Sequence, residues 1–294
     1  MQPDFYIGVD GGGTRCRARL RDAAGRCLGE GMAGPANPRK DARSAREEIL
    51  HACAAALTAA GLPEDALGRA AAGLGLAGVG QEAGRAAVLA LGFPFARLAL
   101  DTDAYAACLG AHGGGDGAVM IVGTGSCGLA LVGGRRTHVG GWGFEVSDDG
   151  SGAWIGQHAV RRSLWAHDGL APETGLTRAV MARFGGDPDA VVAWAGSARP
   201  ADHAAFAALV VEEAGRGDPL AVALMEEAAG HVSCAIGRLA ELGAPAVALV
   251  GGLAGPLRPW LPAEARSLLC EPRADAVDGA ILMVARMLEG EDRR

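Results

Sequence analysis

The segment Asp10-Gly11-Gly12-Gly13-Thr14 combines a carboxylate, three glycines and a hydroxyl directly after an apolar run. Three successive glycines let the backbone turn sharply and approach a ligand without clashes from Cβ atoms. The N–H groups of such a turn can converge on phosphate oxygens, and Asp10 can meet the divalent cation that accompanies a phosphate. The same residues would suit the tight turn of a β-hairpin, so this segment alone leaves both interpretations open.

Two more glycine turns follow apolar runs later in the chain, at Gly123-Thr124-Gly125-Ser126 and at Gly251-Gly252. Each stands where a strand is expected to end, which is where α/β proteins place ligand-binding loops. A single glycine turn is weak support for a nucleotide site, and the order of all three carries more weight.

Carboxylates near predicted strand ends are candidates for acid–base chemistry. Asp103 follows the apolar run 98–100 and precedes a helical pattern, and Asp101 lies two residues earlier. Either residue could cap that helix, because Asp is a favoured N-cap residue. A carboxylate at this place could also accept the proton of an attacking hydroxyl, and the two roles are compatible.

Three other polar positions are candidates for contacts with a substrate. Asn37 lies between two prolines, where Asn usually forms a turn, although its amide can both donate to and accept from hydroxyl groups. Asp148 and Asp149 precede a helical pattern, and either could cap it. Cys127 follows the second glycine turn and could simply be a buried strand residue.

Alternation and helical spacing predict the elements that position these residues. Strands are predicted at 5–9, 14–21, 26–32, 70–77, 98–100, 118–122, 127–132, 135–139 and 247–250. Helices are predicted at 41–60, 81–91, 104–111, 151–167, 174–184, 188–194, 201–214, 218–242, 256–265 and 276–288. The order strand, glycine turn, strand, turn, strand occurs twice, which predicts an internal structural duplication.

Composition restricts the class of protein. The 294 residues, half of them hydrophobic, suit one large or two medium globular domains. A net charge of −7 without a basic stripe argues against a nucleic-acid partner. The seven cysteines show no C-x-x-C spacing, which predicts reduced thiols in the cytoplasm. No signal peptide is predicted, and the longest uncharged stretch, 117–134, is too rich in Gly, Thr and Ser to predict a membrane span.

Four blocks in order and spacing resemble the sugar kinase/Hsp70/actin superfamily. Within it the chain is similar to the branch of N-acetylglucosamine kinases and BadF/BadG/BcrA/BcrD ATPases, and most of all to bacterial glucosamine kinases. The resembling blocks are 8–19, 102–112, 121–128 and 147–152. The likeness covers nearly the whole chain and is weaker over 165–240.

This resemblance implies an α/β fold with two ribonuclease-H-like domains, the actin-like ATPase fold, around an ATP cleft. It implies an N-terminal domain of residues 1–107 plus 275–294, which carries the first phosphate turn, the sugar loop and the catalytic Asp. Residues 108–274 would form the C-terminal domain, with the second phosphate turn and the adenosine turn.

The resemblance also assigns site residues. Asp103 is implied as the catalytic base toward the sugar 6-hydroxyl, and Asp10 as the residue that meets Mg²⁺. The implied ATP contacts are Gly11, Gly12, Gly13, Thr14, Gly123, Thr124, Gly125 and Ser126 for the phosphates, with Gly251 and Gly252 against the adenosine. The implied sugar contacts are Asn37, Asp103, Thr124, Cys127 and Asp148.

The implied activity is that of an ATP-dependent hexosamine kinase, a cytoplasmic transferase that converts glucosamine to glucosamine 6-phosphate in amino-sugar metabolism. At the position of Cys127, the resemblance implies an Asn in N-acetylglucosamine kinases of this branch. A thiol suits a free amine better than an acetamido group. Glu145 and Asp149 are equal candidates to meet that amine. The alternatives are an N-acetylglucosamine kinase and an ATPase that activates a dehydratase. The expected partner is a small amino sugar, with no nucleic acid or membrane, and a homodimer is compatible with the sequence.

Overall fold

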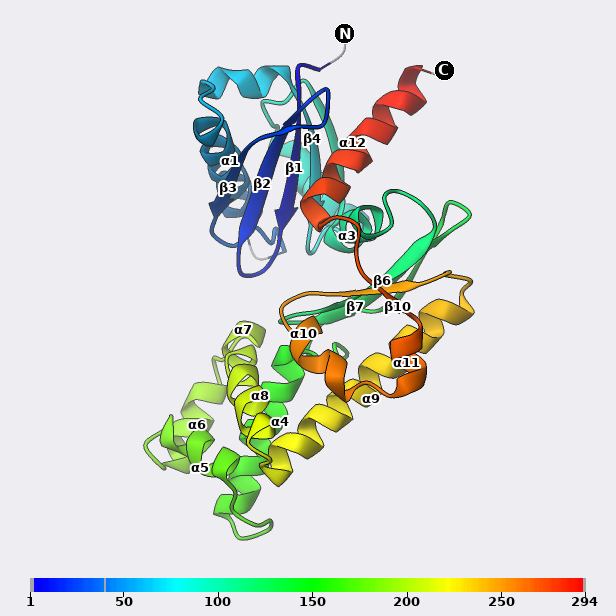
Figure 1. Ribbon diagram of the computed structural model, residues 1–294. Helices are drawn as coiled ribbons and strands as arrows, with labels where there is room; N and C mark the ends of the chain where they lie inside the picture. Colours follow the sequence, from blue (N-terminus) through cyan, green and yellow to red (C-terminus); the bar gives the residue numbers. More distant parts are fainter. Residues whose placement is uncertain (1–2, 40, 293–294) are drawn as a thin grey trace. The chain divides into compact units, whose positions relative to one another are not determined.

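The computed structural model describes residues 3–39 and 41–292, which divide into two compact units (Figure 1). Unit 1 contains the described residues up to Gly117 together with those from Glu271 onward, and unit 2 contains residues 118–270. Each unit has its own hydrophobic core.

The units do not begin and end at the boundaries expected from the sequence. The polypeptide passes from one unit to the other after Gly117 and again after Cys270, instead of at 107/108 and 274/275. The first expected boundary falls inside α3 (Asp103–Ala111), a continuous helix that belongs to unit 1 as a whole.

Unit 1 is built on a five-stranded sheet in the order β3-β2-β1-β4-β5. The strands are β1 (Phe5–Gly11), β2 (Cys16–Asp22), β3 (Cys27–Ala33), β4 (Ala70–Leu76) and β5 (Arg97–Thr102). The first three strands pair antiparallel, and β1, β4 and β5 pair parallel. The parallel strands all end at one edge, which therefore gathers the residues that follow them.

Some helices of unit 1 contact this sheet, and the others contact the first of these helices (Figure 1). They are α1 (Ala42–Ala59), η1 (Glu64–Arg69), α2 (Glu82–Ala90), α3, and the final helix α12 (Ala276–Asp292). The helix α12 contacts β1, β4 and α3, and Gly73 and Gly279 make this close approach possible. A Cβ atom at Gly73 would overlap the carbonyl oxygen of Ala280, and one at Gly279 would overlap that of Ala106.

Unit 2 contains a second five-stranded sheet, in the order β10-β9-β6-β7-β8. The strands are β6 (Gly117–Val122), β7 (Ser126–Val132), β8 (Arg135–Gly140), β9 (Val247–Val250) and β10 (Leu269–Cys270). Read from the other edge, this order is β8-β7-β6-β9-β10. It matches the order β3-β2-β1-β4-β5 of the first sheet when β6 corresponds to β1 and each later strand to the next. The internal duplication predicted from the glycine turns is therefore confirmed at the level of topology.

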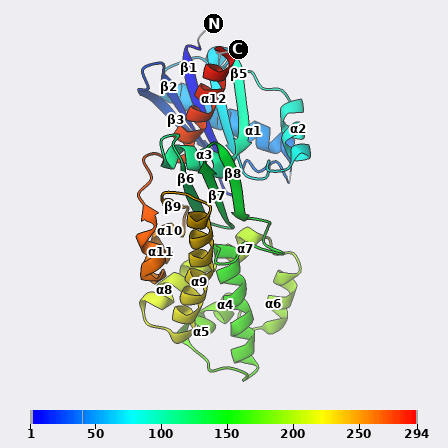
Figure 2. The ribbon, with the colours of Figure 1, turned by 90° about the vertical axis from the view of Figure 1, so that its right-hand side faces the viewer.

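The rest of unit 2 is helical, with α4 and α9 side by side (Figure 2). Its helices are α4 (Gly152–His167), α5 (Gly175–Ala182), α6 (Pro188–Ala195), α7 (Pro200–Ala204), α8 (Ala207–Gly215), α9 (Pro219–Glu241), α10 (Ala254–Leu257), η2 (Arg258–Trp260) and α11 (Ala263–Ser267).

Two long helices predicted from the sequence are interrupted in the structure. The segment 201–214 is divided between α7 and α8, where the Phe206 N–H donates to the His203 carbonyl in the tighter i−3 pattern. The segment 256–265 forms three short helices, because Pro259 and Pro262 lack the N–H that a longer helix would require.

The helix α9 is, by length and composition, apolar enough to cross a membrane. Its buried residues recur at helical spacing and belong to the core of unit 2, among them Leu224, Val232 and Leu239. Charged residues such as Glu226 and Glu227 lie on its exposed face. This pattern is that of an amphipathic helix that covers a protein core.

Candidate active site

Two carboxylates lie at the edge of the unit 1 sheet where the parallel strands end. Asp10 is in β1 and pairs across the sheet with Gly75 of β4, which pairs in turn with Asp101 of β5. Asp103 opens α3, and its Cα lies 3.6 Å from the position that a Cβ at Gly75 would occupy. The missing side chain at Gly75 therefore leaves room between Asp10 and the start of α3.

The capping interpretation of Asp103 and Asp101 is wrong. Thr102 is the N-cap of α3, and its hydroxyl accepts from the Tyr105 N–H at 3.2 Å. Asp101 is nearly buried and pairs with Arg85 at 3.1 Å, so it has a structural partner. Asp103 is the first helical residue, and its carboxylate accepts from the N–H of Ala104.

The electrostatic surroundings of Asp103 suit a proton acceptor. Burial, and next the negative charge of Asp10, raise the pKa of Asp103 to about 6, against the lowering effect of the Ala104 N–H. A general base is most effective when its pKa lies near the working pH. A carboxyl group with this pKa is still mostly ionised at pH 7 and binds a proton more readily than an ordinary Asp.

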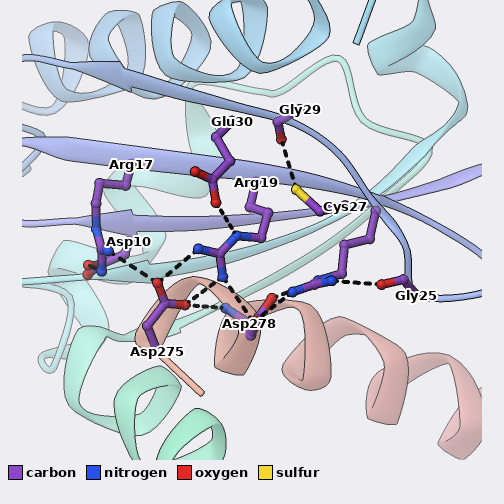
Figure 3. Close-up of polar contacts among 10 residues, drawn as sticks. Asp10, Arg17, Arg19, Gly25, Cys27, Gly29, Glu30, Asp275 and Asp278 are labelled. Atoms are coloured by element: carbon purple, nitrogen blue, oxygen red, sulfur yellow. Dashed lines mark hydrogen bonds and ion pairs between the residues drawn. The ribbon is translucent and has the colours of Figure 1, made fainter. Parts of the chain in front are cut away.

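Arg17 of β2 holds Asp10 in place (Figure 3). Its guanidinium donates to Asp10 Oδ2 at 2.8 Å and to Asp275 Oδ2 at 3.2 Å. Arg19 continues this network by pairing with Asp275 and Asp278 at the start of α12. The alternation of β2 places these arginines on the face that α12 covers, a role that the sequence did not predict.

The segment 11–15 is a hairpin turn between the antiparallel strands β1 and β2. The Gly12 N–H donates to the Arg15 carbonyl at 3.0 Å, so this amide is used inside the turn. Gly13 and Thr14 are exposed, and apart from Gly13 and its two chain neighbours no atom of the described residues lies within 4 Å of a Cβ built at Gly13. The local structure is thus a hairpin whose tip has space for a ligand at Gly13.

The loop 34–38, which contains Asn37, lies beside this turn. The Ala36 N–H donates to the Gly12 carbonyl at 2.9 Å. Asn37 forms the turn expected of it, because its Oδ1 accepts from the Arg39 N–H at 3.0 Å. The structure therefore brings Asn37 to the first glycine turn in the same unit.

The two glycine turns of unit 2 also lie next to each other, since they follow the paired parallel strands β6 and β9. Gly251 has a φ of +104°, and a Cβ there would overlap the carbonyl oxygen of Val122. The Leu253 N–H donates to that same carbonyl at 3.0 Å. Glycine at 251 is thus required by backbone conformation and by close approach, whereas Gly252 has open space beside it.

The start of α4 is connected to the turn 123–126 by backbone hydrogen bonds. The Gly152 N–H donates to the Gly123 carbonyl at 2.8 Å, and the Ala153 N–H donates to the Thr124 carbonyl at 3.0 Å. Ser151, which is fully buried, is the N-cap of α4. The capping interpretation of Asp148 and Asp149 is therefore wrong.

Asp148 and Cys127 both lie next to the second glycine turn. The Asp148 backbone has a φ of 62°, and the side chain places Oδ2 2.5 Å from where a Cβ at Gly125 would be. Cys127 is half-buried in β7, and a Cβ at Gly141 would lie 2.5 Å from the Cβ of Cys127. Glycine at 125 and 141 is needed to accommodate these side chains.

The remaining candidates near this turn are exposed. Glu145 and Asp149, the two carboxylates considered for a contact with the sugar amine, are both exposed. Among the described residues, no group of three or more His, Cys, Asp or Glu side chains could hold a metal ion. The half-buried carboxylate of Asp10 fits Mg²⁺, which keeps several water ligands and takes one or two carboxylates.

Comparisons with known proteins agree in fold and family. The sequence model of the BadF/BadG/BcrA/BcrD ATPase family matches residues 7–265. The chain is 39% identical over 283 residues to a glucosamine kinase of Vibrio cholerae, with 96% of each sequence covered. It is 40% identical to a Chromobacterium violaceum structure named as an N-acetylglucosamine kinase, with a TM-score of 0.91 and coverage of 96% of this chain and 99% of that one.

A more distant solved structure shares the fold. It is a ROK family glucokinase from Streptomyces griseus in complex with glucose and AMPPNP, 21% identical, with a TM-score of 0.54 and coverage of 97% of this chain and 98% of that one. The expected α/β fold of the actin-like sugar kinases, with two five-stranded mixed sheets, is thus confirmed.

Proposed function

Because the chain belongs to the BadF/BadG/BcrA/BcrD ATPase family and matches a glucosamine kinase over nearly its whole length, we propose that it is an ATP-dependent amino-sugar kinase. Its substrate is glucosamine, and its product is glucosamine 6-phosphate. The observation that carries the proposal is Asp103, a carboxylate with a raised pKa beside Asp10 at the end of the parallel strands.

In the proposed reaction the sugar 6-hydroxyl attacks the γ-phosphorus of ATP. The new bond forms between this oxygen and phosphorus, the bond to the bridging oxygen breaks, and ADP leaves with the electron pair. Asp103 accepts the hydroxyl proton. Phosphoryl transfer depends mainly on positioning and charge neutralisation, so the remaining residues bind and orient the reactants.

Unit 1 supplies the first phosphate turn, residues 11–14, together with Asn37 and Asp103. Unit 2 supplies the second phosphate turn, residues 123–126, and the adenosine turn, Gly251 and Gly252. The carboxylate of Asp10 would hold Mg²⁺ through water, and the ion would neutralise charge on the phosphates. The surrounding compartment in this proposal is the cytoplasm.

Recognition of the sugar is proposed to involve Asn37, Asp148, Thr124 and Cys127. Asn37 Oδ1 accepts from the Arg39 N–H, so the Nδ2 group is proposed to donate to the sugar. Cys127 is supported as part of the C2 pocket by its half-buried place beside the second phosphate turn. A weakly polar thiol favours a free amine over an acetamido group.

N-acetylglucosamine is the second candidate substrate, because the Chromobacterium violaceum structure carries that name. A coupled ADP-release assay with glucose, glucosamine, N-acetylglucosamine and mannosamine discriminates between them. We expect glucosamine to have the highest kcat/KM and its product to carry phosphate at O6, as identified by NMR. ADP release that does not depend on any sugar would contradict the proposal and favour the ATPase alternative.

A further inference from the structure

Glu48 of α1 accepts a hydrogen bond from the backbone of the loop 34–38. Among the described residues, no other carboxylate does so. Its Oε2 accepts from the Gly34 N–H at 2.5 Å. The Glu48 side chain is 28% exposed, so water shields this charge-assisted bond only in part. A Cβ at Gly34 would lie 2.9 Å from the same oxygen, which means that the loop and the carboxylate approach as closely as a glycine allows.

The same loop is held at two further points. Ala36, which is fully buried, donates its N–H to the Gly12 carbonyl of the first phosphate turn. Asn37 lies against Gly78, whose φ is +87° and where a Cβ would be 2.5 Å from Asn37 Oδ1. Glu48 therefore fixes one end of a loop whose middle contacts the phosphate turn and whose far side presents Asn37.

Glu48 is also close to the start of β2. Burial, then the charges of Asp10 and Glu48, raise the pKa of the Cys16 thiol to about 12. Cys16 is the first residue of β2, directly after the phosphate turn. Glu48 therefore acts on the start of β2 as well as on the Gly34 backbone.

We infer that Glu48 is a positioning residue for the sugar, which acts by holding the Gly34 backbone so that Asn37 faces the sugar hydroxyls. This inference rests on the proposed function, because it takes Asn37 as a sugar contact. Without the bond from Glu48 the loop would sample other conformations, and sugar binding would have to select the competent one. The affinity for the sugar should fall, while the chemical step at Asp103 should change little.

The test uses the full chain with Glu48→Ala, Glu48→Gln and the control Glu47→Ala. Glu47 is exposed on the same helix, so its replacement changes charge and helix propensity without touching the loop. Glucosamine affinity is measured by calorimetry in the absence of ATP, and kcat and both KM values come from the coupled assay.

For Glu48→Ala we expect glucosamine Kd and KM to rise about tenfold, which corresponds to the loss of one charge-assisted hydrogen bond, with kcat within about threefold of wild type. Glu48→Gln keeps an acceptor oxygen and should recover most of the affinity. Glu47→Ala should equal wild type. Unchanged sugar affinity in Glu48→Ala would overturn the inference, as would a Glu48→Gln variant that is as weak as Glu48→Ala.

A double-mutant comparison tests the route through Asn37. If Glu48 acts by positioning Asn37, adding Glu48→Ala to Asn37→Ala should weaken glucosamine binding no further. Fully additive losses would overturn the inference. A wild-type protein that binds and phosphorylates no sugar of the panel would instead contradict the proposed function, so the two failures are distinguishable.

Discussion

The surroundings that suit Asp103 to the proposed role of general base also cost folding stability, because they disfavour the ionised carboxylate. Burial and the charge of Asp10 disfavour the ionised form of Asp103, and the Ala104 N–H at the start of its own helix donates to its carboxylate. Strain of this kind is common at catalytic positions, where the charged form is needed for function.

Replacing Asp103 by Asn should abolish most turnover and leave ATP binding intact. Loss of a general base typically costs about 10²- to 10⁴-fold in rate. The measurement is kcat in the coupled assay, with ATP affinity from calorimetry. Asp101→Asn is the comparison, since Asp101 pairs with Arg85 and should affect stability more than rate. More than half of wild-type kcat in Asp103→Asn would remove this residue from the role of base.

The same substitution should stabilise the protein near neutral pH. The folded pKa of about 6 lies above the unfolded value of about 4, so the folded state favours the protonated form and loses stability as pH rises from 4 to 6. Asn carries no charge, so Asp103→Asn should raise the free energy of unfolding at pH 7 by about 1–3 kcal/mol. Urea unfolding at several pH values measures this, and the gain should shrink toward pH 4.

The pH dependence of the wild-type rate follows from the same pKa. Only the ionised carboxylate can accept the hydroxyl proton, so kcat/KM should fall as the pH drops through about 6. A rate profile from pH 5 to pH 8 with glucosamine checks this expectation. A profile that remains flat down to pH 5 would show that the essential base has an ordinary carboxyl pKa.

Cys127→Asn should shift the preference toward N-acetylglucosamine. Asn offers a donor and an acceptor to an acetamido group, and one added hydrogen bond contributes roughly 0.5–1.5 kcal/mol, or about three- to tenfold in the ratio of kcat/KM values. Cys234→Asn is the control, because Cys234 is exposed on α9. A ratio that stays constant, or moves toward glucosamine, would assign Cys127 to packing alone.

At the scale of elements, the approach of α12 to α3 and the sheet depends on glycine. Gly279→Ala places a Cβ against the Ala106 carbonyl and should destabilise unit 1 by about 1–3 kcal/mol, although Ala favours helix formation. Gly237→Ala in α9 has open space and should be neutral or stabilising. Urea unfolding of both variants is the measurement, and equal stability for the two would show that α12 shifts without cost.

The packing of α12 on the sheet also connects this helix to the candidate site. Asp275 and Asp278 at its start pair with Arg17 and Arg19, and Arg17 in turn holds Asp10. Residues about 260 positions apart in sequence are thereby joined, since Arg17 and Asp275 differ by 258. A loosened α12 should therefore lower activity as well as stability.

At the scale of the whole molecule, the two hydrophobic cores are separate, and tryptophan reports only one of them. All five tryptophans are in unit 2, at Trp142, Trp154, Trp165, Trp194 and Trp260. Larger chains with several cores often unfold in more than one step. We expect the urea transition seen by tryptophan fluorescence to differ from that seen by circular dichroism, which reports both units.

Asp103→Asn offers a control for this expectation, because it changes unit 1 alone. It should shift the circular dichroism transition and leave the tryptophan transition nearly unchanged. Coincident transitions in both proteins would mean that the units unfold as one cooperative system.

The sequence by itself determined the features that depend on neighbouring residues. The three glycine turns, most of the strands and helices, the duplication and the turn formed by Asn37 follow from local patterns. The two-residue strand β10 and the short helix η1 were not predicted, because they are too short to show a periodic pattern. The sequence did not predict where a long helix divides into shorter ones, as between α7 and α8. These errors concern boundaries, which local propensity specifies weakly.

Only the tertiary structure decided which residues meet across long separations. Thr102 and Ser151 cap the helices that the neighbouring aspartates could have capped. Glu48 bonds to the Gly34 backbone and Arg17 pairs with Asp10 from other elements. The physical reason is that pairing in a sheet and packing of a helix bring distant residues together, and no local pattern encodes that partnership. Asp103 was recognisable from its motif, but its raised pKa follows from burial and from Asp10, which only the folded chain places near it.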